Sequence, residues 1–95
     1  MSPEDAVYYA DDLTEAQRAV VMLSSDSKPT LAETIARGSG YEHSDISCAI
    51  DQLLAMNLIE QQQSRLAGKF FHNYVTLNER GVQVRSIYDQ RGTSK

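Results

Sequence analysis

The stretch "TLAETIARGSGYEHSDISCAIDQLLAMNLIE", residues 30–60, decides the fold of this 95-residue chain. Its second half carries apolar residues at positions i, i+3, i+4, i+7 and i+8, the spacing of a helix with one buried face. These residues are Ile46, Ala49, Ile50, Leu53 and Leu54. A shorter apolar pattern precedes them and is interrupted by glycine. The stretch therefore predicts two helices joined by a tight turn, the second helix over residues 44–56.

Capping signals mark the beginnings of three helices. Thr14 and Gln17 have the spacing of a capping box, and Thr30 and Glu33 repeat this spacing before the short helix. Asn78 is a residue type that commonly caps a helix, and it precedes an apolar stripe. We therefore expect helices to begin after residues 14 and 30, and a last helix to span residues 79–90.

The remaining boundaries follow from residues with special backbone preferences. Ser2 and Pro3 favour a first helix over residues 3–10, because proline suits the first helical position. Gly38 is expected to end the short helix, and Asn57 to end the 44–56 helix in a left-handed conformation. Runs of β-favouring residues then predict a two-stranded hairpin, with strands over residues 58–62 and 70–75.

The overall composition indicates one folded domain over residues 1–95, since a chain of this length with 41% hydrophobic residues supports a single core. No apolar run is long enough to span a membrane, and the acidic N-terminus does not resemble a signal peptide. The single cysteine, Cys48, cannot form an internal disulfide. These features predict a cytoplasmic protein.

The charge is unevenly distributed along the chain. The formal net charge of −4 argues against indiscriminate binding to nucleic acid or anionic lipid. Residues 1–15 carry five acids and no base, whereas residues 80–95 carry a net charge of +3. Between these ends, residues 61–75 contain Arg65 and Lys69 and no acid.

Catalytic and metal-binding patterns are absent from the sequence. It contains no phosphate-cradling glycine loop, no nucleophile elbow and no distinctively spaced pair of carboxylates. His43 and Cys48 are five residues apart and would not share a helix face, so they do not form a zinc pattern. We therefore expect a protein that is not an enzyme and has neither a metal nor a cofactor.

The order helix, helix, helix, strand, strand, helix, with an extra N-terminal helix, resembles the winged helix-turn-helix of small MarR- and PadR-like regulators of archaea, bacteria and phages. The likeness is carried by residues 30–60 and by "FFHNYVTLNERG", residues 70–81, which resembles the return strand and the start of the last helix. It implies a mainly α fold with a small β-hairpin (α+β), divided into an N-terminal extension 1–12, a three-helix core 13–57 with the helix-turn-helix at 30–57, a wing 58–76, a C-terminal helix 78–90 and a loose tail 91–95.

The resemblance also implies binding to double-stranded DNA, with helix 44–56 in the major groove and wing residues 62–72 on the flanking backbone or minor groove. Thr30, at an expected helix N-terminus, is a candidate for a phosphate contact, and Gln52 suits adenine in particular. Carried over position by position, the candidate DNA-binding residues are Thr30, His43, Ser44, Ser47, Cys48, Gln52, Arg65, Lys69 and His72.

Two features depart from the pattern of these regulators. Many relatives place Arg or Lys at the position of Cys48, and Asp51 would repel phosphates one turn further on. A monomer is therefore expected to bind DNA weakly. We expect the protein to act as a homodimer, which doubles the contacts on a palindromic site. The expected dimer surface consists of Val7, Tyr8, Val84, Ile87 and Tyr88.

A second class of function stays open at this point. Helix 44–56 contains Asp45 and Asp51 and no Lys or Arg, so its outer face also suits a protein partner. Winged-helix folds bind either DNA or proteins, so the fold does not decide between these two functions. The serine-rich helix start and the basic wing favour a DNA-binding regulator over an interaction module.

Overall fold

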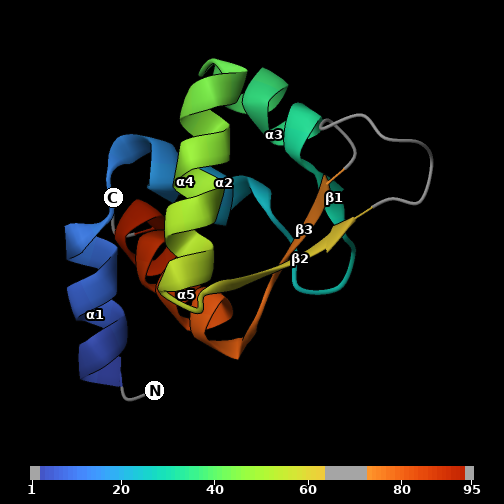
Figure 1. The fold of residues 1–95 in the computed structure, drawn as a ribbon. Coiled ribbons are helices and arrows are strands. Elements are labelled where there is room, and N and C mark those ends of the chain that lie inside the picture. The colour runs from blue at the N-terminus through green and yellow to red at the C-terminus, as the bar shows by residue number, and fades with distance from the viewer. Residues whose placement is uncertain (1–2, 64–72, 94–95) are drawn as a thin grey trace.

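The computed structural model describes residues 3–63 and 73–93, which form five helices and a three-stranded antiparallel sheet (Figure 1). The predicted order of the helices and the two wing strands is confirmed, and one short strand, β1, is additional. None of the described helices is long and apolar enough to cross a membrane. The helices are α1 Pro3–Asp12, α2 Glu15–Leu23, α3 Ala32–Ser39, α4 His43–Ala55 and α5 Glu79–Thr93, and the strands are β1 Thr30–Leu31, β2 Ile59–Gln63 and β3 Asn73–Leu77.

Three of the expected helix ends are confirmed. Thr14 Oγ1 accepts from the Gln17 backbone N–H at 3.2 Å, and Gln17 Oε1 accepts from the Thr14 N–H at 3.0 Å. Asn78 Oδ1 caps α5 by accepting from the Gly81 N–H at 2.9 Å. Asn57 has a φ of 60° and terminates α4, which lets the Leu58 N–H reach back to an earlier carbonyl of the helix.

Two expected boundaries around α3 are wrong. Thr30 does not cap a helix, because its backbone is paired with Val75 in the sheet and α3 begins only after Leu31. The strand pairing overrides the local capping preference. Gly38 lies inside α3, and Gly40, with a φ of 77°, ends the helix.

Strand β1, which the sequence did not predict, leads into the helix-turn-helix and pairs with the wing strand β3 in one sheet. The strand order is β1-β3-β2, so β3 is central and both of its neighbours are antiparallel to it. Val75 of β3 is opposite Thr30 on one side and Gln61 on the other. The expected strand 70–75 begins outside the described residues, and its observed part ends at Leu77.

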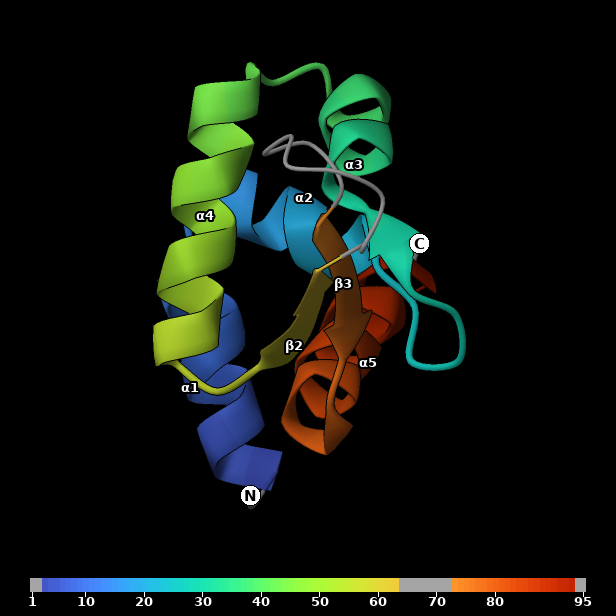
Figure 2. The ribbon, with the colours of Figure 1, turned by 45° about the vertical axis from the view of Figure 1, so that its right-hand side comes forward.

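A single apolar core lies between the helices and the sheet. Helix α2 packs against α3, α4 and α5, and α4 also contacts β2 (Figure 2). Burial of these side chains is the main driving force for the fold, at about 1.5–3 kcal/mol for each large one. The largest fully buried side chains are Ile35, Ile46, Leu53, Leu58, Val20, Val21, Val75 and Val84.

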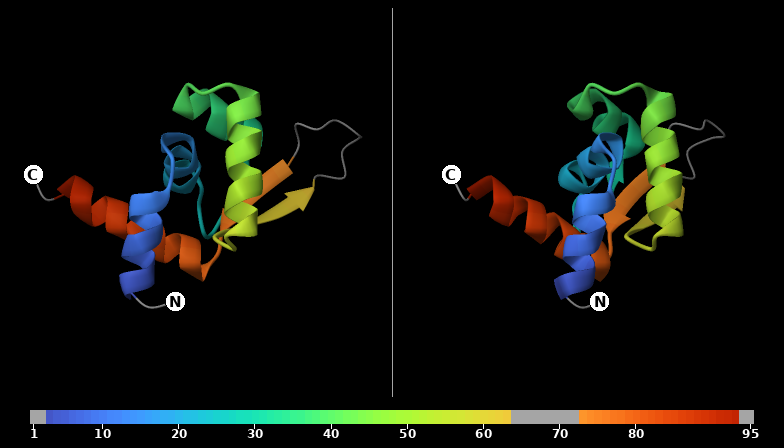
Figure 3. Two further views of the ribbon diagram at one scale, coloured as in Figure 1. Left: turned by 60° about the vertical axis from the view of Figure 1, so that its left-hand side comes forward. Right: turned by 90° about the vertical axis from the view of Figure 1, so that its left-hand side faces the viewer.

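Helix α1 lies across α5, away from the sheet (Figure 3). The buried hydroxyl of Tyr88 donates to the Ala10 carbonyl at 2.7 Å, and the guanidinium carbon of Arg18 lies 4.6 Å from the centre of the Tyr88 ring. Arg91 pairs with Asp11 at 2.7 Å. Both helices are longer than expected, since α1 reaches residue 12, and residues 91–93 of the supposed loose tail are helical.

Gly81 provides a test of the packing between α5 and the turn that follows α4. A Cβ at this position would lie 2.2 Å from the Leu58 carbonyl oxygen and 2.9 Å from Leu77 Cδ2. Because a backbone atom cannot rotate away, we expect Gly81→Ala to lower the free energy of unfolding by about 3 kcal/mol. Urea unfolding followed by circular dichroism measures this loss.

Gly38→Ala is the matched control. Gly38 is exposed in α3, and its Cβ would meet only Leu23 Cδ1 at an ordinary distance of 3.4 Å. We expect a gain of about 0.5–1 kcal/mol from helix propensity. Equal stability of Gly81→Ala and the wild type would contradict the close approach of α5 to Leu58.

Tyr88→Phe tests how α1 is held. Loss of the hydroxyl leaves the buried Ala10 carbonyl without its donor, so we expect a loss of about 1–2 kcal/mol. Burial raises the pKa of Tyr88 above its usual 10.0. The unfolded chain therefore ionises first, and the stability from Tyr88 is complete below pH 10.0 and is lost as the pH rises through the folded-state pKa.

The measurement is the difference in the free energy of unfolding between the wild type and Tyr88→Phe as a function of pH. This difference should stay constant below about pH 10 and shrink above it. A difference that grows in alkali would show that the folded state favours the ionised phenol.

Candidate nucleic-acid interface

Helices α3 and α4 form a helix-turn-helix with α4 along the outside of the domain (Figure 1). The connecting turn is held by its own backbone and one side chain. The Gly40 N–H donates to the Ala36 carbonyl at 3.1 Å, and Ser39 Oγ accepts from the Tyr41 N–H at 3.2 Å. The positive φ of Gly40 suits glycine, which fixes the direction in which α4 leaves the turn.

The two faces of α4 differ sharply in burial. The predicted inner stripe is buried at positions 46, 49, 50 and 53, and Leu54 is half-buried. The opposite face is exposed, and it holds three of the residues predicted on this helix to contact DNA: Ser44, Ser47 and Cys48. In the described part of the chain, no hydrogen bond or ion pair involves its side chains at four positions: Ser44, Ser47, Cys48 and Asp51. These groups face outward and are not used by the fold.

Gln52 lies on the side of α4 that faces α2. Its Oε1 accepts a hydrogen bond from Nε2 of the buried Gln17 at 2.5 Å. The capping-box spacing identified Gln17 as a helix-start residue, but nothing in the sequence pairs it with a residue 35 positions away. The amide of Gln52 borders a hollow of about 310 Å³ that is lined by Thr14, Ala16, Tyr41, Asp45, Cys48, Ala49 and Gln52.

Tyr41 was not predicted as a site residue, yet it stands at the edge of the same hollow. Its hydroxyl donates to Glu15 Oε2 at 3.3 Å. Desolvation by burial and then the nearby Glu15 carboxylate raise the pKa of Tyr41 above its usual value. The phenol therefore stays neutral at physiological pH, and it links the turn before α4 to the first turn of α2.

The charge on the helix-turn-helix is negative. Residues 32–55 contain four acids and one cation, a net charge of −3 with histidine neutral. That cation, Arg37, is paired with Glu33 at 2.7 Å. Among the described residues outside this motif, Arg85 Nη1 donates to the Ser24 carbonyl at 2.9 Å, Arg18 lies over the Tyr88 ring, and Arg91 pairs with Asp11. Much of the described positive charge therefore serves the fold.

The wing candidates Arg65, Lys69 and His72 lie outside the described residues. The base of the wing is described, and it consists of β2 and β3 in continuous antiparallel register from Ile59 opposite Leu77 to Gln63 opposite Asn73. In the view of Figure 2, β2 and β3 lie between α4 and α3, and β2 contacts α4 while β3 contacts α3.

Thr30 and the predicted dimer residues are placed differently from what the sequence suggested. Thr30 is half-buried in β1, so it has no helix N-terminus with which to bind a phosphate. Val84 and Tyr88 are only 0% and 3% exposed within the single chain, which corrects their assignment to a surface between two copies. Ile87 is half-buried, whereas Val7 and Tyr8 are 39% and 70% exposed.

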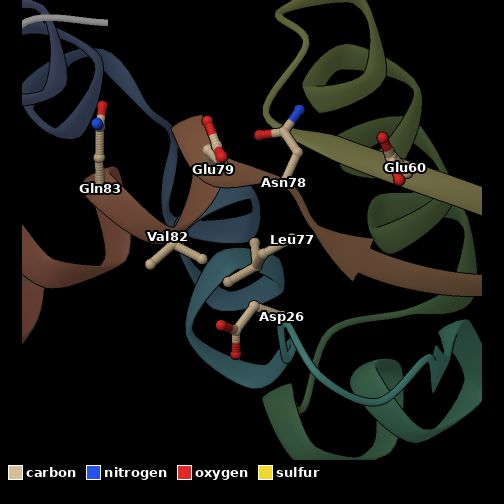
Figure 4. Close-up of a pocket in the computed structure, with 7 residues that line it drawn as sticks. All are labelled: Asp26, Glu60, Leu77, Asn78, Glu79, Val82 and Gln83. Carbon is tan, nitrogen blue, oxygen red and sulfur yellow. The ribbon is translucent and has the colours of Figure 1, made fainter.

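A second hollow, of about 570 Å³, lies where α5 begins and is acidic (Figure 4). Its carboxylates come from the loop after α2, from β2 and from α5. Among the described residues, no group of three or more His, Cys, Asp or Glu side chains is arranged to hold a metal ion. The lining contains three carboxylates and no cation, so its charge does not favour a phosphate; it consists of Asp26, Glu60, Leu77, Asn78, Glu79, Val82 and Gln83.

Solved structures of transcriptional regulators share this fold. SlyA matches with a TM-score of 0.74 and 19% identity, over 90% of this chain and 59% of that one. FabT of Streptococcus pneumoniae, solved in complex with DNA, matches with a TM-score of 0.73 and 8% identity, over 87% and 57% of the two chains. ZitR of Lactococcus lactis, a zinc-responsive MarR family member, gives 0.70 and 16%, over 85% and 54%.

These likenesses establish the winged helix-turn-helix fold of MarR-family regulators and confirm the resemblance at the level of the fold. The chain spans less than two thirds of the length of each of these three proteins. No protein-family model matches the sequence, and no curated protein matches it significantly.

Asn78 fixes the end of α4 relative to α5 and can be tested directly. Besides capping α5, its Nδ2 donates to the Asn57 carbonyl at 2.7 Å. Serine could replace the cap but could not also reach the carbonyl. We expect Asn78→Ser to lower the free energy of unfolding by about 1 kcal/mol and Asn78→Ala by about 2 kcal/mol, because alanine loses both contacts.

Chemical denaturation of the three proteins side by side separates the two contacts of Asn78. A serine variant as stable as the wild type would mean that the link to Asn57 contributes nothing. Equal losses of stability for the serine and alanine variants would mean that the helix cap contributes nothing to stability.

Proposed function

We propose that this chain is a sequence-specific, double-stranded DNA-binding transcriptional regulator of the cytoplasm that acts as a homodimer. Helix residues 44–56 enter the major groove, and wing residues 62–72 contact the flanking backbone or minor groove. The observation that carries this proposal is the exposed outer face of α4, where the side chains of Ser44, Ser47 and Asp51 make no hydrogen bond or ion pair within the described part of the chain. The likeness to FabT, solved in complex with DNA, supports the same function.

Base contacts come from small polar groups in this proposal. The hydroxyls of Ser44 and Ser47 can donate to and accept from base edges, and both are exposed on successive turns of α4. A short side chain requires the helix backbone to approach the base closely. The absence of a long basic side chain on α4 favours that approach but removes the phosphate contacts that usually strengthen binding.

The net charge of −3 on residues 32–55 makes a second subunit necessary for useful affinity. A two-fold dimer presents two recognition helices about 34 Å apart to successive major grooves, and it multiplies two weak interactions. The exposed Val7 and Tyr8 of α1, with the half-buried Ile87 of α5, are the candidates for the contact between copies. Arg65 and Lys69 supply attraction to the DNA backbone.

A protein-interaction module is the second candidate function, and one observation favours it. Glu42, Asp45 and Asp51 are all exposed at or on α4, and no cation lies on that helix. Such a surface attracts a basic partner as readily as it discourages phosphate. In this alternative, α4 binds a basic segment of another protein.

The basic test is a fluorescence anisotropy titration against the duplex upstream of the protein's own gene, at two salt concentrations. We expect saturable binding that weakens with salt and exceeds binding to a scrambled duplex of equal length. Equal affinity for both duplexes, or no binding at low salt, would contradict the proposed function.

Charge reversal separates the two candidate functions. If α4 meets DNA, Asp51→Lys should tighten binding about tenfold and steepen the salt slope by about 1, because a repulsive group becomes a phosphate contact. The double variant Arg65→Glu with Lys69→Glu should abolish binding or flatten the slope by about 2. Anisotropy at several salt concentrations measures both effects.

Asp12→Lys is the matched control, since it makes the same change of charge at an exposed position on α1. It should leave the affinity within about twofold of the wild type. If Asp51→Lys leaves DNA affinity unchanged and instead abolishes binding to a basic protein partner, the interaction module is the correct function.

A further inference from the structure

The amide groups of Gln17 and Gln52 are oriented by a backbone group whose polarity is certain. The Thr14 backbone N–H can only donate, so the Gln17 atom that meets it at 3.0 Å must be the oxygen, Oε1. The other end of the Gln17 amide is therefore Nε2, a donor. It meets Gln52, whose facing atom must accept and is therefore Oε1.

The two hydrogen bonds, from Thr14 to Gln17 and from Gln17 to Gln52, are called the relay below. The relay leaves the NH₂ of Gln52 without a partner in the described part of the chain. Gln17 is only 4% exposed and engages both ends of its amide, so it cannot turn over without losing two hydrogen bonds. Gln52 is exposed on α4, beside Cys48 and Asp45. The NH₂ is thus the part of this amide that makes no contact within the described chain, whereas the oxygen already accepts one hydrogen bond.

We propose that Gln17 is a positioning residue that holds Gln52 as a hydrogen-bond donor toward acceptor atoms of DNA. The acceptors are guanine O6 or N7, thymine O4 or a phosphate oxygen. This inference rests on the proposed function, and it replaces the expectation that Gln52 reads adenine through both atoms of its amide. The bidentate contact to adenine also requires the oxygen, which is bonded to α2.

Gln17→Glu reverses the relay with little change in shape. Glutamate is the usual capping-box residue at this position, so one carboxylate oxygen still accepts from the Thr14 N–H. The other oxygen can only accept, and Gln52 must then turn its NH₂ inward and its oxygen outward. Gln52→Glu also replaces the outward donor by an acceptor. One oxygen of its carboxylate accepts from Gln17 Nε2, and the other oxygen faces outward.

The DNA experiment selects preferred sites from a randomised duplex pool, for the wild type and both glutamate variants. Each variant adds one negative charge, which weakens binding to all sequences alike, so base preference is the main measurement. If Gln52 meets a base edge, we expect the preference at one position to change about tenfold, from acceptor-bearing guanine or thymine to amino-bearing adenine or cytosine. If it meets a phosphate, both variants lose affinity uniformly.

Gln52→Ala, alone and combined with Gln17→Glu, completes a double-mutant cycle. In the alanine background, Gln17→Glu should change neither base preference nor affinity beyond the small effect of its charge. If Gln17→Glu changes base preference and affinity equally in the wild-type and Gln52→Ala backgrounds, Gln17 does not act through Gln52. The proposal is then wrong for a base acceptor and for a phosphate acceptor alike.

A measurement on the protein alone distinguishes failure of this inference from failure of the proposed function. Exchange rates of the side-chain NH₂ protons, observed by ¹⁵N-resolved NMR, should be slow for Gln17 and fast for Gln52 in the wild type. In Gln17→Glu the Gln52 protons should become protected about tenfold. Protected Gln52 protons in the wild type would overturn the proposed orientation, while correct exchange without any binding to DNA would overturn only the regulator function and its DNA acceptors.

Discussion

The backbone of Asn57 and Leu58 is the point at which the helix-turn-helix, the wing and the last helix meet, and the rest of the structure depends on it. Asn57 turns the chain out of α4 with a positive φ, and its carbonyl accepts from Asn78. The next carbonyl, of Leu58, accepts from the Asn78 backbone N–H at 3.3 Å and lies against Gly81. Because all these acceptors are backbone atoms, α4, β2 and α5 cannot shift independently.

The uneven charge of the sequence has a structural counterpart in the contact between α1 and α5. The acidic N-terminal segment and the basic C-terminal segment belong to α1 and α5, which pack together. The pair Arg91–Asp11 is largely exposed and contributes little on its own. The buried hydroxyl of Tyr88, which donates to the Ala10 carbonyl, contributes more to this contact. The ring of Tyr88 also lies against Arg18 of α2, which holds α5 to that helix.

Local patterns in the sequence predicted most of the fold but not the partners of each element. The stripe of α4, the cap at Thr14 and the turn at Asn57 are properties of neighbouring residues, and all three were found. Strand β1 could not be predicted, because two residues carry no periodicity and their pairing with β3 is determined by tertiary contact. The same limit applies to Val84, since periodicity identifies an apolar side but not what covers it.

The candidate site was predicted in part for the same reason. Exposure of Ser44, Ser47 and Cys48 follows from the helical period, because they lie opposite the buried stripe. The orientation of Gln52 depends on Gln17, which is distant in sequence and was recognised only for its local role as a cap. Residue type suggested a reader of adenine, whereas the hydrogen-bond partner determines which atom of the amide faces outward.

The central position of β3 has a consequence for how such a domain can change over time. One edge of β3 pairs with the strand that leads into α3, and the other pairs with the wing strand (Figure 1). The spacing between the start of α3 and the hairpin is therefore set by main-chain hydrogen bonds. Substitutions along the outer face of α4 can alter which chemical groups are presented without changing that spacing. The length of surface that a partner must match then stays the same.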